Sequence, residues 1–178
     1  MFKIINNRRG FTLMEMIIAA GLFAILSVVV SGIFMAANNL QQQAVSSERL
    51  QNDGRYILDK IAKEVRGREV NLVYPSDNPT STLSFKSDEF NDVVTFFYDS
   101  NSVWYDINGD FATLNSDDVE VIDLKFFTYP TKDPFSYVSP ADIQPRVTVF
   151  LKMRNKLQNK YQKEIFLQTT ISSKYYRR

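Results

Sequence analysis

The sequence predicts an α+β protein in which one long helix comes first and packs on an antiparallel sheet. Residues 11–66 are first continuously apolar and then apolar at a spacing of three to four, which is typical of a helix. After Asn71 the spacing changes to two, in segments rich in Val, Phe, Tyr and Thr. Strands that follow a helix without alternating with further helices indicate an α+β fold rather than a parallel α/β fold.

The first segment has the length of a membrane span. Met16–Ala37 contains 22 residues and no charge, and at about 1.5 Å per residue it crosses a hydrocarbon core of roughly 30 Å. Lys3, Arg8 and Arg9 precede it, so the N-terminus is expected in the cytoplasm and the remainder outside it. A cleaved secretory signal has a shorter apolar region and a small-residue cleavage site, and this segment has neither.

Glu15 lies at the start of this apolar run. A carboxylate at the centre of a bilayer costs about 2.5–3.5 kcal/mol on insertion scales, and less near the edge. Leucine at the same place would make a more stable anchor, so Glu15 is expected to have a cationic partner. That partner is either a residue of another protein or an amino group freed by cutting the chain beside Gly10.

The sequence Arg9-Gly10-Phe11-Thr12-Leu13-Met14-Glu15, followed by a long apolar helix, resembles the class III signal of type IV pilins and type II secretion pseudopilins. The resemblance implies cleavage between Gly10 and Phe11 by prepilin peptidase and N-methylation of Phe11. It also implies that Glu15 pairs with the N-terminal amine of a neighbouring subunit. The implied partners are other pilins or pseudopilins and an inner-membrane assembly platform.

This resemblance divides the chain into a cleaved leader (1–10), a transmembrane and fibre-core helix (11–37) and an exported domain (38–178). The exported domain begins with an amphipathic helix over 38–66, which Gly67 is expected to stop. Gly54 weakens this helix by about 1 kcal/mol relative to alanine and is a candidate bend. Its expected buried stripe is Leu50, Ile57, Leu58, Ile61 and Val65, and its expected solvated face is Glu48, Arg49, Asp59, Lys60, Lys63 and Glu64.

The β region is expected to form one antiparallel sheet. Thr131–Pro145 contains three prolines and is predicted to be a loop, and the polar stretch Asn155–Tyr161 is predicted to join the last two strands as a hairpin. The predicted strands are Thr82–Lys86, Val93–Tyr98, Ser102–Ile107, Val119–Tyr129, Arg146–Met153 and Glu164–Ser172.

The order of a long helix, a sheet and a late hairpin is similar to the pilin fold. With Arg49-Leu50-Gln51 and Arg55, it most resembles the J-type minor pseudopilins and the W-type minor pilins. This resemblance implies a place at or near the fibre tip, where minor subunits prime assembly. Gly32 stands where many major pilins have proline, and Glu15 argues against the K-type subunit, which commonly lacks that glutamate.

Composition argues against an enzyme. The chain has no cysteine and no histidine, which excludes disulfides, thiolate chemistry and Cys-based zinc sites and removes the commonest general base. The acidic group Asp117, Asp118, Glu120 and Asp123 has no accompanying nucleophile or phosphate-binding loop. The net charge of +1 gives no basic excess, so a nucleic-acid partner is left undetermined.

One segment resembles part of a calcium loop. Asp106, Asn108 and Asp110 stand at alternate positions, but Phe111 replaces the glycine that such a loop requires. Asn-Gly between β-type residues is a strong signal for a two-residue hairpin turn. We therefore expect a turn at Asn108-Gly109 and no cofactor, with calcium as the weaker alternative.

Two adjacent aromatic pairs, Phe96-Phe97 and Phe126-Phe127, fall within predicted strands. Because side chains alternate between faces, one ring of each pair is expected to point out of the core. A partner surface is one use for the outward rings, and the sequence does not say which rings these are.

The residues are also compatible with two other functions. The first is an uncleaved, bitopic membrane-anchored binding module or sensor, which processing at Gly10 would distinguish from a fibre subunit. The second and weaker one is a membrane-tethered enzyme. Type II secretion, twitching and DNA-uptake fibres share the N-terminal signal, so the resemblance does not select one machine.

Overall fold

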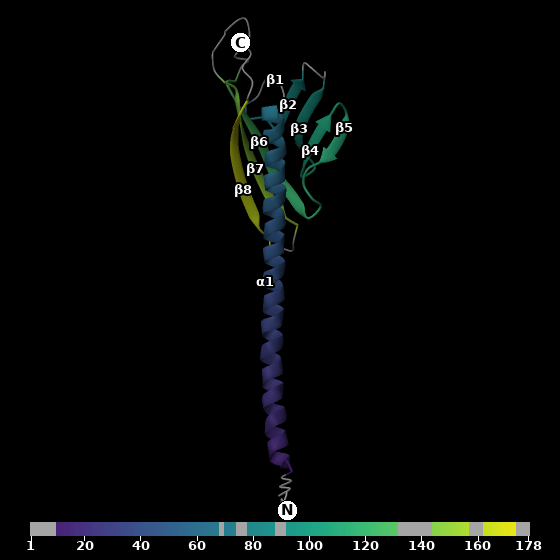
Figure 1. The fold of residues 1–178 in the computed structure, drawn as a ribbon, viewed down its shortest axis with the longest axis vertical. Helices are drawn as coiled ribbons and strands as arrows, with labels where there is room; N and C mark the ends of the chain where they lie inside the picture. Colours follow the sequence, from purple (N-terminus) through teal and green to yellow (C-terminus); the bar gives the residue numbers. More distant parts are fainter. Residues whose placement is uncertain are drawn as a thin grey trace, which may run out of the picture. The chain divides into compact units, whose positions relative to one another are not determined.

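In a computed structural model the chain forms one helix followed by strands (Figure 1), and the structure describes residues 10–67, 70–73, 78–87, 92–131, 144–156 and 162–173. Two compact units, Met1–Ala44 and Val45–Arg178, are described separately. Three predicted segments lie mostly outside the described residues: the leader, the Thr131–Pro145 loop and the 155–161 connection. Residues 174–178 also lie outside them. The elements are α1 (Leu13–Gly67), β1 (Val70–Val73), β2 (Thr82–Ser87), β3 (Val93–Asp99), β4 (Ser102–Ile107), β5 (Asp110–Thr113), β6 (Val119–Tyr129), β7 (Arg146–Asn155) and β8 (Glu164–Ser172).

The first unit contains the apolar part of α1. The predicted helix over 11–66 is confirmed, beginning two residues later and ending one residue later. Among the described residues, α1 is the one helix long and apolar enough to cross a membrane. Its most apolar part is not buried within the chain, so this apolar surface needs a lipid or protein neighbour.

The second unit contains the C-terminal part of α1 and two antiparallel sheets. The predicted α+β fold is confirmed, with the expected sheet divided into a five-stranded sheet, β1-β2-β3-β4-β5, and a three-stranded sheet, β6-β7-β8. The division arises because β6 pairs with β7 rather than with β5. Between the sheets, the Thr80 and Phe126 backbones form a bridge with hydrogen bonds of 3.0 and 2.8 Å, and the Val121 N–H of β6 donates to the Asn101 carbonyl of the β3–β4 turn at 2.8 Å.

The six predicted strands all form, and β7 and β8 make the predicted hairpin pair. The sequence did not predict β1 and β5, which are four residues each. All four residues of β5 are exposed, so β5 has no buried face to produce an alternating pattern.

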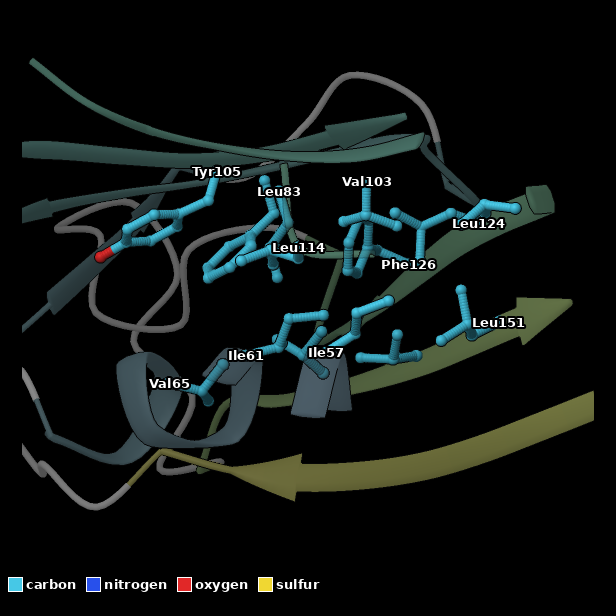
Figure 2. Packing of buried hydrophobic residues seen from close by; sticks show 14 of the residues in the cluster. Ile57, Ile61, Val65, Leu83, Val103, Tyr105, Leu114, Leu124, Phe126 and Leu151 are labelled. Carbon is cyan, nitrogen blue, oxygen red and sulfur yellow. The ribbon is translucent and has the colours of Figure 1, made fainter. Parts of the chain in front are cut away.

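The core lies between the second part of α1 and the inner faces of both sheets. Leu50, Ile57, Ile61 and Val65 of α1 are at most 4% exposed, as the predicted stripe requires, and Leu58, the fifth predicted member, is only partly buried against the core. Figure 2 shows Ile57, Ile61 and Val65 opposite buried residues of both sheets: Leu83, Val103, Tyr105, Phe126 and Leu151. Because one helix stripe contacts two sheets, this helical segment is part of the core that joins them.

Gly54 marks a close approach rather than an interruption of the helix. The residue is buried and α1 continues through it. A Cβ atom built at Gly54 would lie 2.3 Å from Leu167 Cδ1, which is closer than real carbon atoms approach. The missing side chain thus lets β8 pack directly on the helix.

The prediction that Glu64 belongs to the solvated face is wrong. Glu64 is only 7% exposed, and its Oε1 accepts a 3.0 Å hydrogen bond from the Tyr105 hydroxyl. Lys60 Nζ lies 3.6 Å from the same oxygen and 4.4 Å from the centre of the Tyr105 ring. These contacts compensate the cost of burying a carboxylate.

Candidate processing and assembly site

The predicted cleavage bond precedes the helix. Gly10 and Phe11 are not helical, and α1 begins at Leu13. The Phe11 side chain is 84% exposed, and no atom lies within 4 Å of the place where a Cβ of Gly10 would be. In the described part of the chain, the bond between Gly10 and Phe11 is therefore exposed and lies ahead of the first helical residue.

Thr12 and Glu15 form a capping box at the start of α1. Glu15 Oε2 accepts hydrogen bonds from the Thr12 backbone N–H at 2.9 Å and from the Thr12 hydroxyl at 3.0 Å. In return, the Glu15 backbone N–H donates to Thr12 Oγ1 at 3.3 Å. This reciprocal pattern satisfies backbone donors that the first turn leaves unpaired.

Thr12 belongs to the signal motif, but its role as the cap of the helix was not among the sequence predictions. The signal was present, because a Thr followed three positions later by Glu and then an apolar run marks a helix N-terminus. The cap gives Glu15 a role inside its own chain, before any partner is considered. Hydrogen bonds to neutral groups do not remove its charge, so the cap does not replace a cationic partner in hydrocarbon.

The apolar part of α1 satisfies its own polar groups. The Ser27 hydroxyl donates to the Phe23 carbonyl and the Ser31 hydroxyl to the Ser27 carbonyl, both at 2.8 Å. The places where Gly21 and Gly32 would carry a Cβ are open. With hydroxyls paired within the helix, this segment suits a surrounding of lipid or of other apolar helices.

The predicted turn at Asn108-Gly109 is confirmed. Both residues have positive φ, 54° and 97°, as a two-residue hairpin turn between β4 and β5 requires. Asp106 Oδ1 accepts from the Gly109 N–H at 2.7 Å, and Asn108 Oδ1 accepts from the Val93 N–H at 2.9 Å. Two side-chain oxygens that were candidate calcium ligands therefore accept backbone hydrogen bonds at this hairpin instead. Asp110 begins β5, and the described part of the chain contains no group of three or more Asp, Glu, His or Cys residues arranged to hold a metal.

Three of the four residues in the acidic group form ion pairs. Asp118 pairs with Arg49 of α1, and Asp123 lies 2.9 Å from Lys125. Glu120 accepts a 2.6 Å hydrogen bond from Arg154, and this bond lowers the pKa of Glu120 below its ordinary 4.5. The Arg49–Asp118 pair joins α1 to the start of β6 and the Glu120–Arg154 pair joins β6 to β7, whereas the Asp123–Lys125 pair lies within β6.

The aromatic pairs are divided between core and surface as predicted. Phe96 and Phe126 are fully buried. Phe97 lies on the other face, parallel to Trp104 with ring centres 6.4 Å apart, and Phe127 is 37% exposed with its ring 5.1 Å from that of Phe150. Each sheet therefore has aromatic rings on its outer face.

Residues 5–37 match the family described as the Prokaryotic N-terminal methylation motif. This motif is typical of type IV pilins and pseudopilins. No curated protein and no solved structure matches the chain. The chain is pilin-like or pseudopilin-like, with a prepilin cleavage motif and a pilin-like α+β fold, and this class of protein is structural rather than enzymatic.

Proposed function

We propose that this protein is a minor pilin or pseudopilin that enters a fibre at or near its tip and primes assembly there. In this proposal prepilin peptidase cuts the precursor between Gly10 and Phe11, and Phe11 is then N-methylated. The observation that carries the proposal is the accessible Gly10–Phe11 bond directly ahead of a capped apolar helix with Glu15 in its first turn.

The proposed role of Glu15 is to pair with the Phe11 ammonium of a neighbouring subunit. Methylation keeps the charge of that amine, so the pair joins two opposite charges in an apolar surrounding. In that surrounding, an unpaired charge costs far more free energy than the ion pair gains. Pairing therefore selects the register between neighbouring helices more than it adds stability.

The proposed arrangement follows from the same division of the chain. Residues 1–10 are the leader, residues 11–37 cross the inner membrane and later line the fibre, and residues 38–178 are exported. The N-terminus of the precursor stays in the cytoplasm, because the basic residues Lys3, Arg8 and Arg9 precede the apolar run. Its partners are prepilin peptidase, other minor and major subunits, and the inner-membrane assembly platform.

The minor position is supported by the order of elements and by the helix itself. A long helix is followed by strands and ends in the β7–β8 hairpin, as the likeness to J-type and W-type subunits implies. Gly32, where many major pilins have proline, lies within continuous helix. Purified fibres provide the check, because a minor subunit is expected at a small fraction of the amount of the major one.

The first experiment measures processing. The chain is produced together with a prepilin peptidase, and its intact mass and N-terminal peptide are determined beside a Gly10→Val control. We expect the wild-type chain to begin at Phe11 and to be one methyl group heavier, with the control uncut. A wild-type chain that still begins at Met1 would contradict the proposal and favour the uncleaved membrane-anchored binding module.

A second experiment separates the charge of Glu15 from its cap. Glu15→Gln keeps the capping box, since glutamine also serves at this position, but removes the charge. Glu15→Ala removes both, and Thr12→Ala keeps the charge while weakening the cap by about 1 kcal/mol. We expect all three variants to be cut, and only Thr12→Ala to enter purified fibres. Normal incorporation of Glu15→Gln would show that the hydrogen bonds, and not the charge, matter.

A further inference from the structure

The outer face of the five-stranded sheet carries three aromatic rings that are not part of the core. Trp104 lies parallel to Phe97, with ring centres 6.4 Å apart and ring planes 10° apart, and Phe111 meets the Phe97 ring edge-on at 6.3 Å. Phe111 is 61% exposed, and Phe97 and Trp104 are partly exposed. Exposed aromatic side chains that lie together on one face are typical of a surface that binds another molecule.

Two carboxylates stand on either side of Trp104 along the strands. Asp106 follows Trp104 by two positions on β4, so both side chains lie on the same face of the sheet. Asp99 follows Phe97 by two positions on β3, and strand pairing places it level with Ser102, two positions before Trp104. We call five residues the acidic aromatic face: Phe97, Asp99, Trp104, Asp106 and Phe111.

Neither of these carboxylates pairs with a cation of the described chain. Asp99 Oδ2 accepts a 2.9 Å hydrogen bond from the Ser100 hydroxyl, and Asp106 Oδ1 accepts one of 2.7 Å from the Gly109 N–H. Both donors are neutral, and the ion pairs among the described residues involve neither Asp99 nor Asp106. The charge of each carboxylate is therefore not compensated within the described chain, and its second oxygen can accept further hydrogen bonds.

The outer face of the three-stranded sheet differs in this respect. Lys125 lies 2.9 Å from Asp123, and Lys152 lies 2.9 Å from Glu164, so cations and carboxylates neutralise each other there. The sequence shows the same contrast, because residues 70–118, which contain β1 to β5, have nine acidic and one basic side chain. The acidic aromatic face is therefore complementary to a cationic partner, and it repels the phosphates of a nucleic acid.

Arginine fits this face better than lysine does. Its planar guanidinium stacks on an aromatic ring and also donates two parallel hydrogen bonds to a carboxylate. The indole N–H of Trp104 already donates to the Asp99 carbonyl at 3.1 Å, so the part of this side chain left for a ligand is the face of its ring. A ring next to a carboxylate occurs twice, because Asp99 follows Phe97 along β3 and Asp106 is opposite Phe111.

The spacing of the two carboxylates predicts the spacing of the cations that bind them. Asp99 is level with Ser102 and is therefore four strand positions, about 13 Å, from Asp106. In an extended segment, residues four positions apart are separated by the same distance and point to the same side, as does the residue midway between them. A segment that lies along β4 can thus place one arginine at each carboxylate and an apolar side chain on Trp104.

We propose that the acidic aromatic face binds an extended segment of a different protein that carries two arginines four residues apart, with an apolar residue midway between them. This sequence has no two arginines at that spacing, so we assign the segment to another protein and not to a second copy of this chain. The inference goes beyond the proposed function and does not depend on it, because it concerns a surface of the unit formed by residues 45–178 and not the processing site.

The test uses the full-length chain in an uncharged detergent and the fluorescence of Trp104, the only tryptophan, which lies on the face itself. The probe is the synthetic peptide acetyl-Gly-Arg-Thr-Leu-Thr-Arg-Gly-amide. One control peptide has the same composition in the order Gly-Arg-Thr-Leu-Arg-Thr-Gly, with the arginines three apart, and a second has lysine in place of both arginines. We expect a saturable fluorescence change with the probe, and about tenfold weaker binding of either control peptide.

Variants of the chain locate the binding on this face. Asp99→Asn and Asp106→Asn each remove one charge, and asparagine at 106 still has an oxygen that can accept from the Gly109 N–H. We expect each variant to bind the probe about fivefold more weakly and the double variant to lose the preference for arginines four apart. The matched control is Asp117→Asn, which removes an exposed carboxylate outside the face and is expected to bind like the wild type.

Three results would overturn the proposal. Equal binding of the probe and its composition-matched isomer, or equal loss of binding in Asp117→Asn, would mean unspecific attraction between charges. A fluorescence change with chitohexaose and none with the probe would assign the rings to a sugar. Dimers of the full-length chain that block the probe, and that disappear when residues 174–178 are removed, would assign the face to the basic end of a second copy. None of these results bears on processing at Gly10, which the peptidase experiment tests separately.

Discussion

The close approach of β8 to α1 gives a quantitative prediction for Gly54→Ala. Alanine is favoured over glycine inside a helix by about 1 kcal/mol, so the substitution alone should stabilise the protein. The new Cβ would lie 2.3 Å from Leu167 Cδ1, and a distance under 3.0 Å requires a shift. Overpacking a core costs about 1–3 kcal/mol.

The structure indicates which neighbour must move. Met153 Sδ at 3.5 Å and Ile165 Cδ1 at 3.6 Å are at ordinary contact distances from the new Cβ, so only Leu167 obstructs it. Because Leu167 Cδ1 is the end of a rotatable side chain, the overpacking cost is expected at the low end of this range, about 1 kcal/mol, so Gly54→Ala should leave the stability of the wild-type protein nearly unchanged. In a Leu167→Ala background the obstruction is gone, and the same change should stabilise by about 1 kcal/mol.

The assay is guanidinium unfolding of the full-length chain in detergent, followed by the fluorescence of Trp104, the only tryptophan. Four proteins form the cycle: wild type, Gly54→Ala, Leu167→Ala and the double variant. The expected interaction energy is about 1 kcal/mol. An interaction below about 0.5 kcal/mol, with Gly54→Ala stabilising the wild type as much as it stabilises the Leu167→Ala background, would refute an obstruction by Leu167.

Three further predictions concern the exported domain. Tyr105→Phe should cost about 1–3 kcal/mol of unfolding free energy, because the buried Glu64 carboxylate loses a hydrogen-bond donor; an unchanged unfolding midpoint would contradict this. The pKa of Glu120 is lowered by Arg154 in the folded protein, so the stability that the pair contributes is present above pH 4.5 and is lost as the pH falls through the lower folded-state value. The unfolding free energy of Glu120→Gln should therefore depend less on pH in this acidic range than that of the wild type. Addition of calcium or EDTA should leave the melting temperature unchanged, because Asp106 serves the turn; a calcium-dependent rise would restore the calcium-loop interpretation.

The helix and most strands were predictable because their signals are local. The run Met16–Ala37 is apolar and uncharged over its whole length, and the stripe from Leu50 to Val65 keeps a spacing of three to four over several turns. Strand β5 gives no such signal, since all of its side chains are exposed. The division into two sheets was not predictable either, because it depends on which strand pairs with β6.

The close approach at Gly54, which the sequence did not reveal, and the error at Glu64 have a common cause. Each residue is explained by a neighbour far along the chain, Leu167 in one case and Tyr105 in the other. A glycine that allows close packing and a glycine that weakens a helix look the same in one sequence. A glutamate beside lysine on a helix likewise looks solvated until a strand brings a hydroxyl to it.

The candidate site was more predictable than the core, because processing signals are read along the chain.

The capping box adds a physical argument for assembly. The first turn of α1 has a partial positive charge of about one half, which Glu15 offsets. If cleavage places an ammonium on Phe11, that end of a single subunit becomes positive overall and is costly to keep in hydrocarbon. A neighbouring Glu15 can neutralise it. Because Glu15 lies four residues along the chain from Phe11, bringing the two groups level requires a stagger between neighbouring helices, and a stagger that serves one pair separates the reciprocal pair. The pairing therefore favours an open series of subunits over a closed dimer, as a fibre requires.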